Sequence, residues 1–394
     1  MTIQSGRNFL HTPGPTNIPD RVLRAMVRPA VDLNDADFMA MALSCFGDLQ
    51  KVFETESNVY IYSANGHGAW EAALVNVLSA GDCVLVPETG HFSFNWSVMA
   101  ESLGLEVDYV ETDWRRAIDP DMIAQRLRAD SGHRIKAVLM VHTDTATSVT
   151  SSIPAIRKAL NDTGHPALLL VDTIAALATV PFKFDEWGID VAVAASQKGL
   201  MQPPGLAFNA VSQKALQMSE KATLPRNYWD WRRRHGREFY SHFCGTAPVH
   251  QLFALREALD MVHEEGMEAI IARHQSLAGA VRSAVEVWCE GGALSFNVTA
   301  AEERANSVTT ILVDEAYNAT ALRETCSSRF NVSLGAGYGR LQGRAFRIGH
   351  MGYLNEPMIL GAIASVETCL AVCGIPHGAG GTQAAIASLS ESGS

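Results

Sequence analysis

Two charged residues, Lys198 and Asp172, each stand at the end of an apolar run. Lys198 follows Val191–Ala195 on a Ser-Gln-Lys-Gly turn, and Asp172 closes the run Ala167–Asp172. Short apolar runs of this kind are typical of buried strands. A lysine held against an apolar core is either an ion-pair partner or a chemical group, because desolvation lowers the pKa of its amine and lets it form a Schiff base with a carbonyl.

Asp172 also admits two interpretations. A buried carboxylate needs a cationic or N–H partner, so Asp172 could cap a turn or pair with an arginine. A carboxylate opposite a pyridinium nitrogen would instead keep that nitrogen protonated and make the ring an electron sink. Because sites in open α/β sheets lie beyond the carboxyl ends of the strands, Lys198 and Asp172 form a matched pair for pyridoxal phosphate.

Three other positions at strand ends or within strands carry polar groups. The run Val59–Tyr62 leads into Asn65-Gly66-His67-Gly68 before a helical pattern, which predicts either a plain turn or an anion site. The residues His142 to Thr147 offer hydroxyls and a carboxylate that could equally bond their own backbone. Arg347, between Phe346 and Ile348, needs an anion, which could be a substrate carboxylate or an internal partner.

Composition bounds the class of protein. The 394 residues carry a net charge of −11, which argues against nucleic acid or an anionic membrane as a partner. Seven cysteines are dispersed without a metal-ligand spacing, as expected for free thiols in a reducing compartment. We find neither a signal-peptide pattern nor a long enough apolar segment to span a bilayer, so the sequence predicts a soluble, cytoplasmic protein without a metal site.

Apolar runs and amphipathic stretches alternate from residue 59 to residue 211, which predicts an α/β fold around a mostly parallel seven-stranded sheet. The expected strands are Val59–Tyr62, Cys83–Pro87, Glu106–Glu111, Ala137–His142, Ala167–Asp172, Val191–Ala195 and Leu206–Val211.

The pattern changes after that sheet. Long helices are expected at His250–Glu265 and Glu268–Trp288, the second leading into a smaller α+β domain. That domain is expected to hold strands Val308–Val313 and Ala345–His350 and helices Ala319–Phe330 and Pro357–Cys373. We predict an N-terminal arm at 1–15, a large domain at 16–265, a small domain at 266–375 and a flexible tail at 376–394, within which Gln383–Leu389 could be helical.

Several segments together resemble the class V aminotransferases, and within them the alanine/serine–glyoxylate aminotransferase group. The resemblance runs in order from about residue 9 to residue 375. It rests on Pro13-Gly14-Pro15-Thr16, Ala64 to Ala73, Val171-Asp172, Ser196-Gln197-Lys198-Gly199, Pro203-Pro204-Gly205, Gly245 to Val249 and Phe346-Arg347-Ile348-Gly349.

The resemblance implies the type I pyridoxal-phosphate fold and a homodimer with shared active sites. Lys198 would carry the cofactor and Asp172 would pair with its ring nitrogen. Phe92 would stack on the ring, and Thr145 would bond the ring oxygen. By the same resemblance, the phosphate would be held by Asn65, Gly66, His67 and Gln197, with Thr246 from the other subunit, and Arg347 would bind the substrate carboxylate.

Three positions depart from the family pattern. Phe243 stands where a phosphate-binding tyrosine is common, Leu33-Asn34 replaces a frequent His-Arg, and Tyr338 replaces an aliphatic residue near the substrate pocket. These departures bear on the substrate, so serine, alanine, aspartate and other amines all stay open as donors.

The sequence thus predicts a ping-pong aminotransferase that passes an amino group from a small amino acid to glyoxylate or a similar 2-oxo acid. Alternatives are another amine donor with pyruvate or glyoxylate, or a lyase or desulfurase that uses the same cofactor, although no cysteine suits a desulfurase. A nicotinamide dehydrogenase is disfavoured because Asn65-Gly66-His67-Gly68 lacks the third glycine of that motif. A binding module built on the basic, aromatic segment Arg226 to Phe243 is the non-enzymatic alternative.

Overall fold

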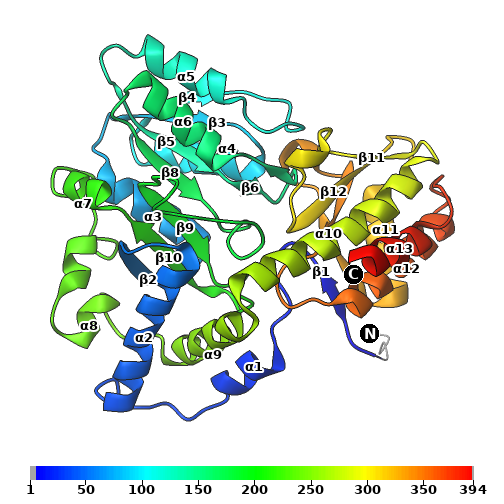
Figure 1. Ribbon diagram of the computed structural model, residues 1–394, viewed down its shortest axis with the longest axis horizontal. Coiled ribbons are helices and arrows are strands. Elements are labelled where there is room, and N and C mark those ends of the chain that lie inside the picture. The colour runs from blue at the N-terminus through cyan, green and yellow to red at the C-terminus, as the bar shows by residue number, and fades with distance from the viewer. Residues whose placement is uncertain (1–5, 393–394) are drawn as a thin grey trace.

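A seven-stranded sheet forms the centre of the larger domain in the computed structural model, which describes residues 6–392 (Figure 1). The reversed strand β10 is antiparallel to both neighbours, and the run from β9 to β4 is parallel throughout. Across the sheet the order is β2 Asn58–Ala64, β10 Gly205–Val211, β9 Val191–Ala195, β8 Leu168–Asp172, β5 Ile135–Val141, β3 Cys83–Pro87 and β4 Glu106–Val110. The predicted mostly parallel sheet is confirmed, and each strand lies within two residues of its expected bounds.

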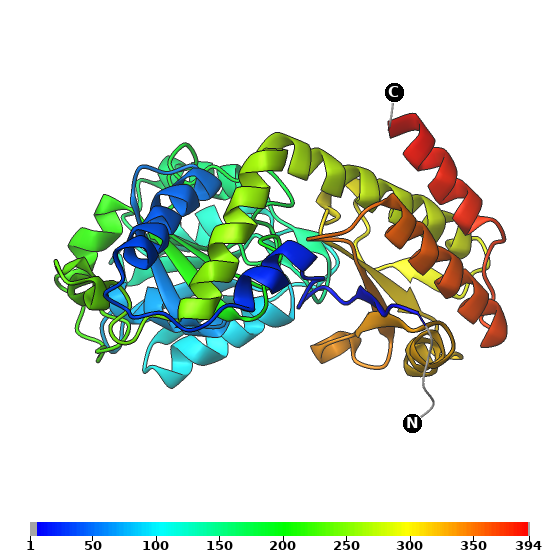
Figure 2. The same ribbon diagram turned by 90° about the horizontal axis from the view of Figure 1, so that it is seen from below.

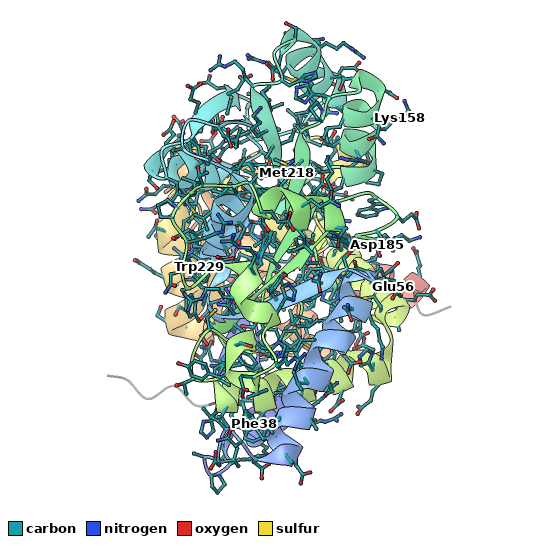
Figure 3. All side chains as sticks on the ribbon, turned by 90° about the vertical axis from the view of Figure 1, so that its left-hand side faces the viewer. Phe38, Glu56, Lys158, Asp185, Met218 and Trp229 are labelled. Atoms are coloured by element: carbon teal, nitrogen blue, oxygen red, sulfur yellow. The ribbon has the colours of Figure 1, made fainter. Side chains whose placement is uncertain are left out.

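Helices cover both faces of this sheet because its strands are apolar on both sides. Along β8, Leu169 and Val171 belong to one apolar core, whereas Leu168 and Leu170 belong to the other. The first core is covered by α2 Ala36–Phe53, α5 Pro120–Ala129, α6 Ile153–Thr163 and α9 Val249–Glu265, and the second by α3 Gly66–Val77, α4 His91–Ser102 and α7 Gln213–Ser219. In Figure 3, Phe38 of α2 and Lys158 of α6 mark the first face, and Trp229 packs against the second.

The segment from residue 226 to residue 243 packs onto the large domain through η1 Trp231–His235 and α8 Phe239–His242. Trp231 donates to the Tyr62 hydroxyl over 2.7 Å, and Arg234 is buried, donating to the carbonyl oxygens of Ile61, Tyr228 and His242. The basic and aromatic side chains that suggested a binding surface therefore serve, in large part, internal packing.

A second, five-stranded sheet forms the small domain. β1 runs parallel to β13, and the remaining pairs are antiparallel. The order is β1 Phe9–His11, β13 Val332–Ala336, β14 Ala345–Gly349, β12 Val308–Val313 and β11 Leu294–Phe296. Sequence reasoning found β12 and β14 and missed the other three. β1 and β11 have only three residues each, and β13, Val-Ser-Leu-Gly-Ala, is not a continuous apolar run.

Four helices complete the core of the small domain: α10 Met267–Cys289, α11 Ala319–Phe330, α12 Glu356–Val372 and α13 Gly381–Ser392. The helical alternative for Gln383–Leu389 is the one observed, and the helix is longer than expected. The Glu367 carboxylate accepts hydrogen bonds from the backbone N–H groups of Gly380, Gly381 and Thr382 at the start of α13, and Ala385 is fully buried. Residues 381–392 are therefore a docked helix and not a loose tail.

The chain crosses between the two domains twice. The N-terminal strand β1 lies in the small-domain sheet, after which the chain crosses to α1 Asp20–Met26, packed against α9 (Figure 2). α9 leads directly into α10 through Gly266, whose φ of +84° favours glycine. The domain boundaries stay a prediction. Within residues 6–392, no helix has the length and apolar composition that a bilayer crossing requires.

Candidate active site

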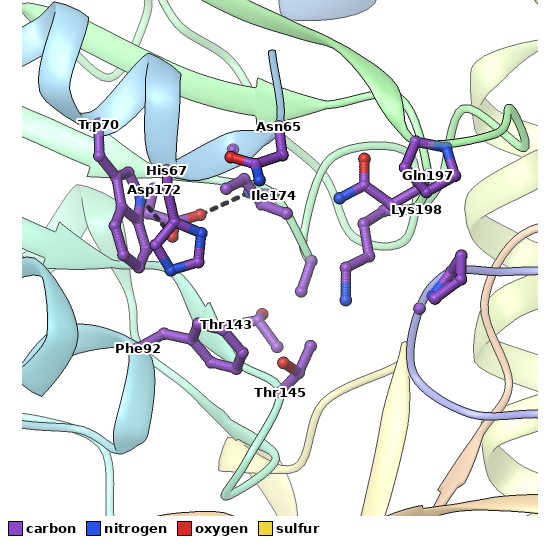
Figure 4. Close-up of a pocket in the computed structure, with 15 residues that line it drawn as sticks. Asn65, His67, Trp70, Phe92, Thr143, Thr145, Asp172, Ile174, Gln197 and Lys198 are labelled. Carbon is purple, nitrogen blue, oxygen red and sulfur yellow. Dashed lines mark hydrogen bonds between the residues drawn. The ribbon is translucent and has the colours of Figure 1, made fainter.

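The carboxyl ends of β8 and β9 open into a cavity of about 260 Å³ (Figure 4). Eight of the predicted site residues line it. The lining comprises Gly14, Pro15, Asn65, Gly66, His67, Trp70, Phe92, Thr143, Thr145, Asp172, Ile174, Ala175, Gln197, Lys198 and Pro204. Residues from positions 14 to 204 meet here because adjacent parallel strands end at the same edge of the sheet.

Asp172 closes β8 at the wall of this cavity. Its Oδ2 accepts a hydrogen bond from Trp70 Nε1 over 2.9 Å, and its Oδ1 accepts from the Ile174 N–H over 2.7 Å. Burial nevertheless raises the pKa of the carboxyl to about 7, because two hydrogen bonds do not offset the lost hydration. A cation placed beside Asp172 would therefore be held by, and would stabilise, its ionised form.

Lys198 follows β9 and presents its amine to the same cavity. Its Nζ donates to the carbonyl oxygen of Pro13, which the N-terminal segment brings across from the small domain. Burial, followed by the nearby Arg347 charge, lowers the pKa of the amine to about 8, although Asp172 and Asp144 act in the opposite direction. A sizeable fraction of Lys198 is therefore neutral near physiological pH, as a nucleophilic or proton-accepting amine must be.

The start of α3 lies at one end of the cavity. Asn65 is the N-cap residue, accepting from the Gly68 N–H, and Gly66 and His67 follow in the first turn. The first N–H groups of a helix have no partner within the helix, so this end attracts negative charge. Gln197 reaches the cavity from the β9 turn with a buried, unpaired Oε1, and its terminal amide can turn to present its NH₂ group instead.

Trp70 is a site residue to which sequence reasoning gave no role. It bonds Asp172, lies 4.5 Å from the His67 ring centroid and stacks on Trp96 at 5.6 Å. It lies within the segment Ala64 to Ala73, which the sequence singled out only as a whole. Its position three residues after His67, on the same helical face, is a signal that could have identified it.

Asp144 is buried but does not line the cavity. Its carboxylate accepts hydrogen bonds from the backbone N–H groups of Phe92 and Ala146 over 2.8 and 2.9 Å. The turn-bonding interpretation of residues 142–147 is therefore correct for Asp144, which fixes the start of α4. This start places the Phe92 ring at the cavity, and Thr145, the next residue along the turn, also lines it.

Arg347 lies on β14 of the small domain, with only 2% of its surface exposed. Its Nε donates to the Ala336 carbonyl over 2.6 Å, and its Nη1 donates to the Thr145 carbonyl over 2.7 Å. Among residues 6–392 no carboxylate forms an ion pair with it, so the internal salt bridge allowed by the sequence does not occur. The Tyr338 ring lies 4.5 Å from this guanidinium, which joins both predicted substrate residues in one cluster.

Four of the positions singled out in the sequence lie apart from the cavity. Thr246 is exposed in the segment before α9 and does not line the cavity of its own chain. Phe243 is buried and packs against Phe46 and Phe239, so it contributes to the core of the large domain. Leu33 and Asn34 line a separate surface groove with Tyr240.

Known proteins resemble this chain along nearly its whole length. The family model for class-V aminotransferases matches residues 8–339. A serine–glyoxylate aminotransferase from Methylorubrum extorquens is 44% identical, covering 94% of this chain and 92% of the relative. An L-aspartate–glyoxylate aminotransferase from Paracoccus denitrificans is 37% identical, covering 94% and 93%.

Solved structures also resemble this chain in fold. The ureidoglycine–glyoxylate aminotransferase of Bacillus subtilis superposes with a TM-score of 0.89 at 27% identity, covering 99% of this chain and 100% of that one. The predicted fold class and the family resemblance are confirmed.

Proposed function

We propose, from the premise that the chain belongs to the class-V aminotransferase family, that it moves an amino group from a small amino acid to glyoxylate or a similar 2-oxo acid. Serine, alanine and aspartate are the candidate donors. One observation carries the proposal: Lys198 and Asp172 face a single cavity from the ends of adjacent parallel strands. The buried Arg347 is near enough to lower the pKa of the Lys198 amine, and it forms no ion pair with a carboxylate among residues 6–392.

The cavity suits pyridoxal phosphate, which would be the cofactor. A buried amine, a buried carboxyl with a raised pKa and a helix start with unpaired N–H groups are the three partners that an aldehyde, a ring nitrogen and a phosphate need. Asn65, Gly66, His67 and Gln197 would hold the phosphate, Phe92 would stack on the ring, and Thr145 would bond its oxygen.

When bound, pyridoxal phosphate supplies a carbonyl carbon that bonds amines and a ring that takes up an electron pair. The protein supplies the remainder of the chemistry. The Asp172 carboxylate would keep the ring nitrogen protonated, and Trp70 holds that carboxylate in place. The neutral Lys198 amine would take the proton from the substrate α-carbon as a base and then, as an acid, deliver it to the carbon on the other side of the amino nitrogen.

Arg347 would orient the substrate by its carboxylate. Two N–H groups of Arg347 donate hydrogen bonds to backbone carbonyl oxygens, and these bonds fix the plane of the guanidinium. The remaining N–H donors of Arg347 can bind an anion. Both half-reactions of a ping-pong cycle use a 2-amino or 2-oxo acid, so a single carboxylate site serves donor and acceptor alike. Tyr338 would cover this site.

A homodimer would complete each site with Thr246 from a second copy. Exposed apolar side chains support an interface on this side of the large domain, since they are unusually many for a free surface. They are Leu23, Val27, Val31, Leu43 and Tyr240, on or between α1, α2 and α8. A cytoplasmic location stays a prediction from the free cysteines.

A lyase or desulfurase chemistry on the same cofactor is the second candidate. A desulfurase needs a cysteine able to reach the substrate, and among residues 6–392 no cysteine lines the cavity. Cys326 and Cys369 are buried within the small-domain core. Transamination therefore fits the site better.

The purified protein tests the proposal. We expect a visible absorbance band from bound pyridoxal phosphate that borohydride removes, and a screen of amino donors against glyoxylate and pyruvate should yield the matching 2-oxo acid. A protein without such a band, or one that turns over no donor with either acceptor, would contradict it.

A further inference from the structure

A loop of the small domain reaches across to the large domain beside the substrate cluster. This clasp loop, residues 337–342, connects β13 to β14 and contains η3 Gly339–Leu341. Its Arg340 donates to the Thr112 carbonyl over 2.9 Å and to the Glu88 carboxylate over 3.1 Å. The same guanidinium lies 4.9 Å from the centroid of the Trp114 ring.

On the large domain, the clasp loop is held by a buried carboxylate, that of Glu88. The Glu88 side chain is 1% exposed, directly after β3, and among the described residues Arg340 is the one basic side chain that pairs with it. The Tyr109 hydroxyl is close by, and burial together with Glu88 raises its pKa. Removing the cation from a buried carboxylate is costly, so Glu88 holds Arg340 more firmly than an exposed partner would, although Arg340 itself is 52% exposed.

Tyr338 lies in the clasp loop two residues before Arg340, so the contacts of Arg340 also fix the position of Tyr338. Gly337 and Gly339 flank Tyr338, and a Cβ at Gly337 would overlap the Leu341 carbonyl oxygen. Gly339 has a φ of +55°, and a Cβ there would come within 2.7 Å of the Trp114 ring. Because the loop is packed this tightly, Arg340 cannot leave Glu88 without moving Tyr338.

Tyr338 in turn covers the buried guanidinium. Its ring lies 4.5 Å from Arg347 and 5.4 and 6.4 Å from the rings of His91 and Phe92. An aromatic face over a guanidinium excludes water from it, and a carboxylate binds more strongly where water is excluded.

We propose that Arg340 is a positioning residue for substrate binding. By fastening the clasp loop to Glu88 and Thr112, it holds Tyr338 against Arg347 and thereby sets the affinity for the carboxylate of the amino acid and of the 2-oxo acid. This inference rests on the proposed aminotransferase function. The side chains of Lys198 and Asp172 bond Pro13, Trp70 and Ile174, and among the described residues no hydrogen bond or ion pair links them to the clasp loop. Arg340 is therefore not expected to control the rate of the chemical steps.

The test compares Arg340→Met with Arg344→Met in the cofactor-loaded protein. Arg344 pairs with Glu315 on the same domain, but both side chains are exposed, at 62% and 77%, so the control removes an equivalent charge without touching the clasp. We expect Arg340→Met to raise KM for both donor and acceptor roughly tenfold and to change kcat by less than about twofold, with Arg344→Met unchanged.

Two further variants distinguish positioning from loss of folding. Glu88→Gln keeps the shape of the anchor without its charge and should raise KM in the same direction. In a Tyr338→Ala background, Arg340→Met should add little, because the residue through which it acts is gone.

An Arg340→Met protein with wild-type KM overturns the inference, as does an equal rise of KM in the Tyr338→Ala background. A wild-type protein that binds no pyridoxal phosphate and transfers no amino group overturns the proposed function itself, and the inference with it.

Discussion

The two sides of the candidate active site are built differently. The large-domain side places Asn65, Asp172 and Lys198 at the ends of strands in one sheet, so the topology of that sheet brings them together. The small-domain side brings Tyr338 and Arg347 from a separate sheet, positioned by contacts between domains. We expect the first side to govern the cofactor and the chemical steps, and the second to govern the affinity for substrate.

Loss of the Lys198 amine should give the largest effect. Lys198→Ala is expected to lower kcat by about 10⁴-fold or more, since it removes both the attachment point and the proton-transfer group, and to abolish the visible band. Lys158→Ala, on the exposed face of α6, is the matched control (Figure 3). A fully active Lys198→Ala protein would remove the chemical role of the large-domain side.

Asp172→Asn should lower kcat by about 10²- to 10³-fold, because a neutral amide cannot hold the ring nitrogen protonated. Trp70→Phe, which removes one hydrogen bond from the carboxylate, should act in the same direction by roughly tenfold. Steady-state kinetics together with the absorbance of the bound cofactor measure both. Equal activity of Asp172→Asn and wild type would assign the aspartate to structure alone.

Arg347→Met tests the small-domain side of the site. We expect kcat/KM to fall by about 10²-fold through KM, with the affinity for pyridoxal phosphate unchanged, because in our proposal the guanidinium binds the substrate carboxylate and not the cofactor. Titration of the cofactor-free protein, followed by kinetics, separates the two quantities. Loss of cofactor binding in this variant would mean that the two sides are not functionally distinct.

The smallest expected effect is a pH dependence on the large-domain side. The amine must be neutral to react, so the rate at which cofactor-free protein takes up pyridoxal phosphate should rise with pH and level off near the lowered Lys198 pKa of about 8. An ordinary lysine would give a rise that continues toward pH 10. Stopped-flow absorbance at fixed cofactor concentration measures the profile, with inflection near 10 as the contradicting result.

Sequence reasoning succeeded where local pattern and topology coincide. All seven strands of the large sheet were found because buried parallel strands are continuous apolar runs, and such a sheet must bring its carboxyl ends to one edge. Asp172 and Lys198 followed from that rule, and the resemblance assigned roles to Asn65, Phe92 and Gln197.

The features that sequence reasoning missed depend on contacts between residues far apart in the chain, which no local sequence pattern predicts. The strands β1 and β11 have only three residues each, β13 contains a serine and a glycine, and β1 exists because residues 9–11 pair with residues 332–334. The Trp70–Asp172 hydrogen bond joins residues 102 positions apart, and the Pro13–Lys198 hydrogen bond joins residues 185 positions apart.

The sequence by itself therefore determined the α/β fold, the family and the pairing of a lysine with an aspartate, since these follow from hydrophobic periodicity and short motifs. The tertiary structure decided that Phe243 belongs to the core, that Arg347 pairs with no carboxylate of the described residues, and that Arg340 and Glu88 join the two domains beside Tyr338. The physical reason is that packing between domains selects partners by shape and charge over hundreds of residues, a range at which periodicity carries no signal.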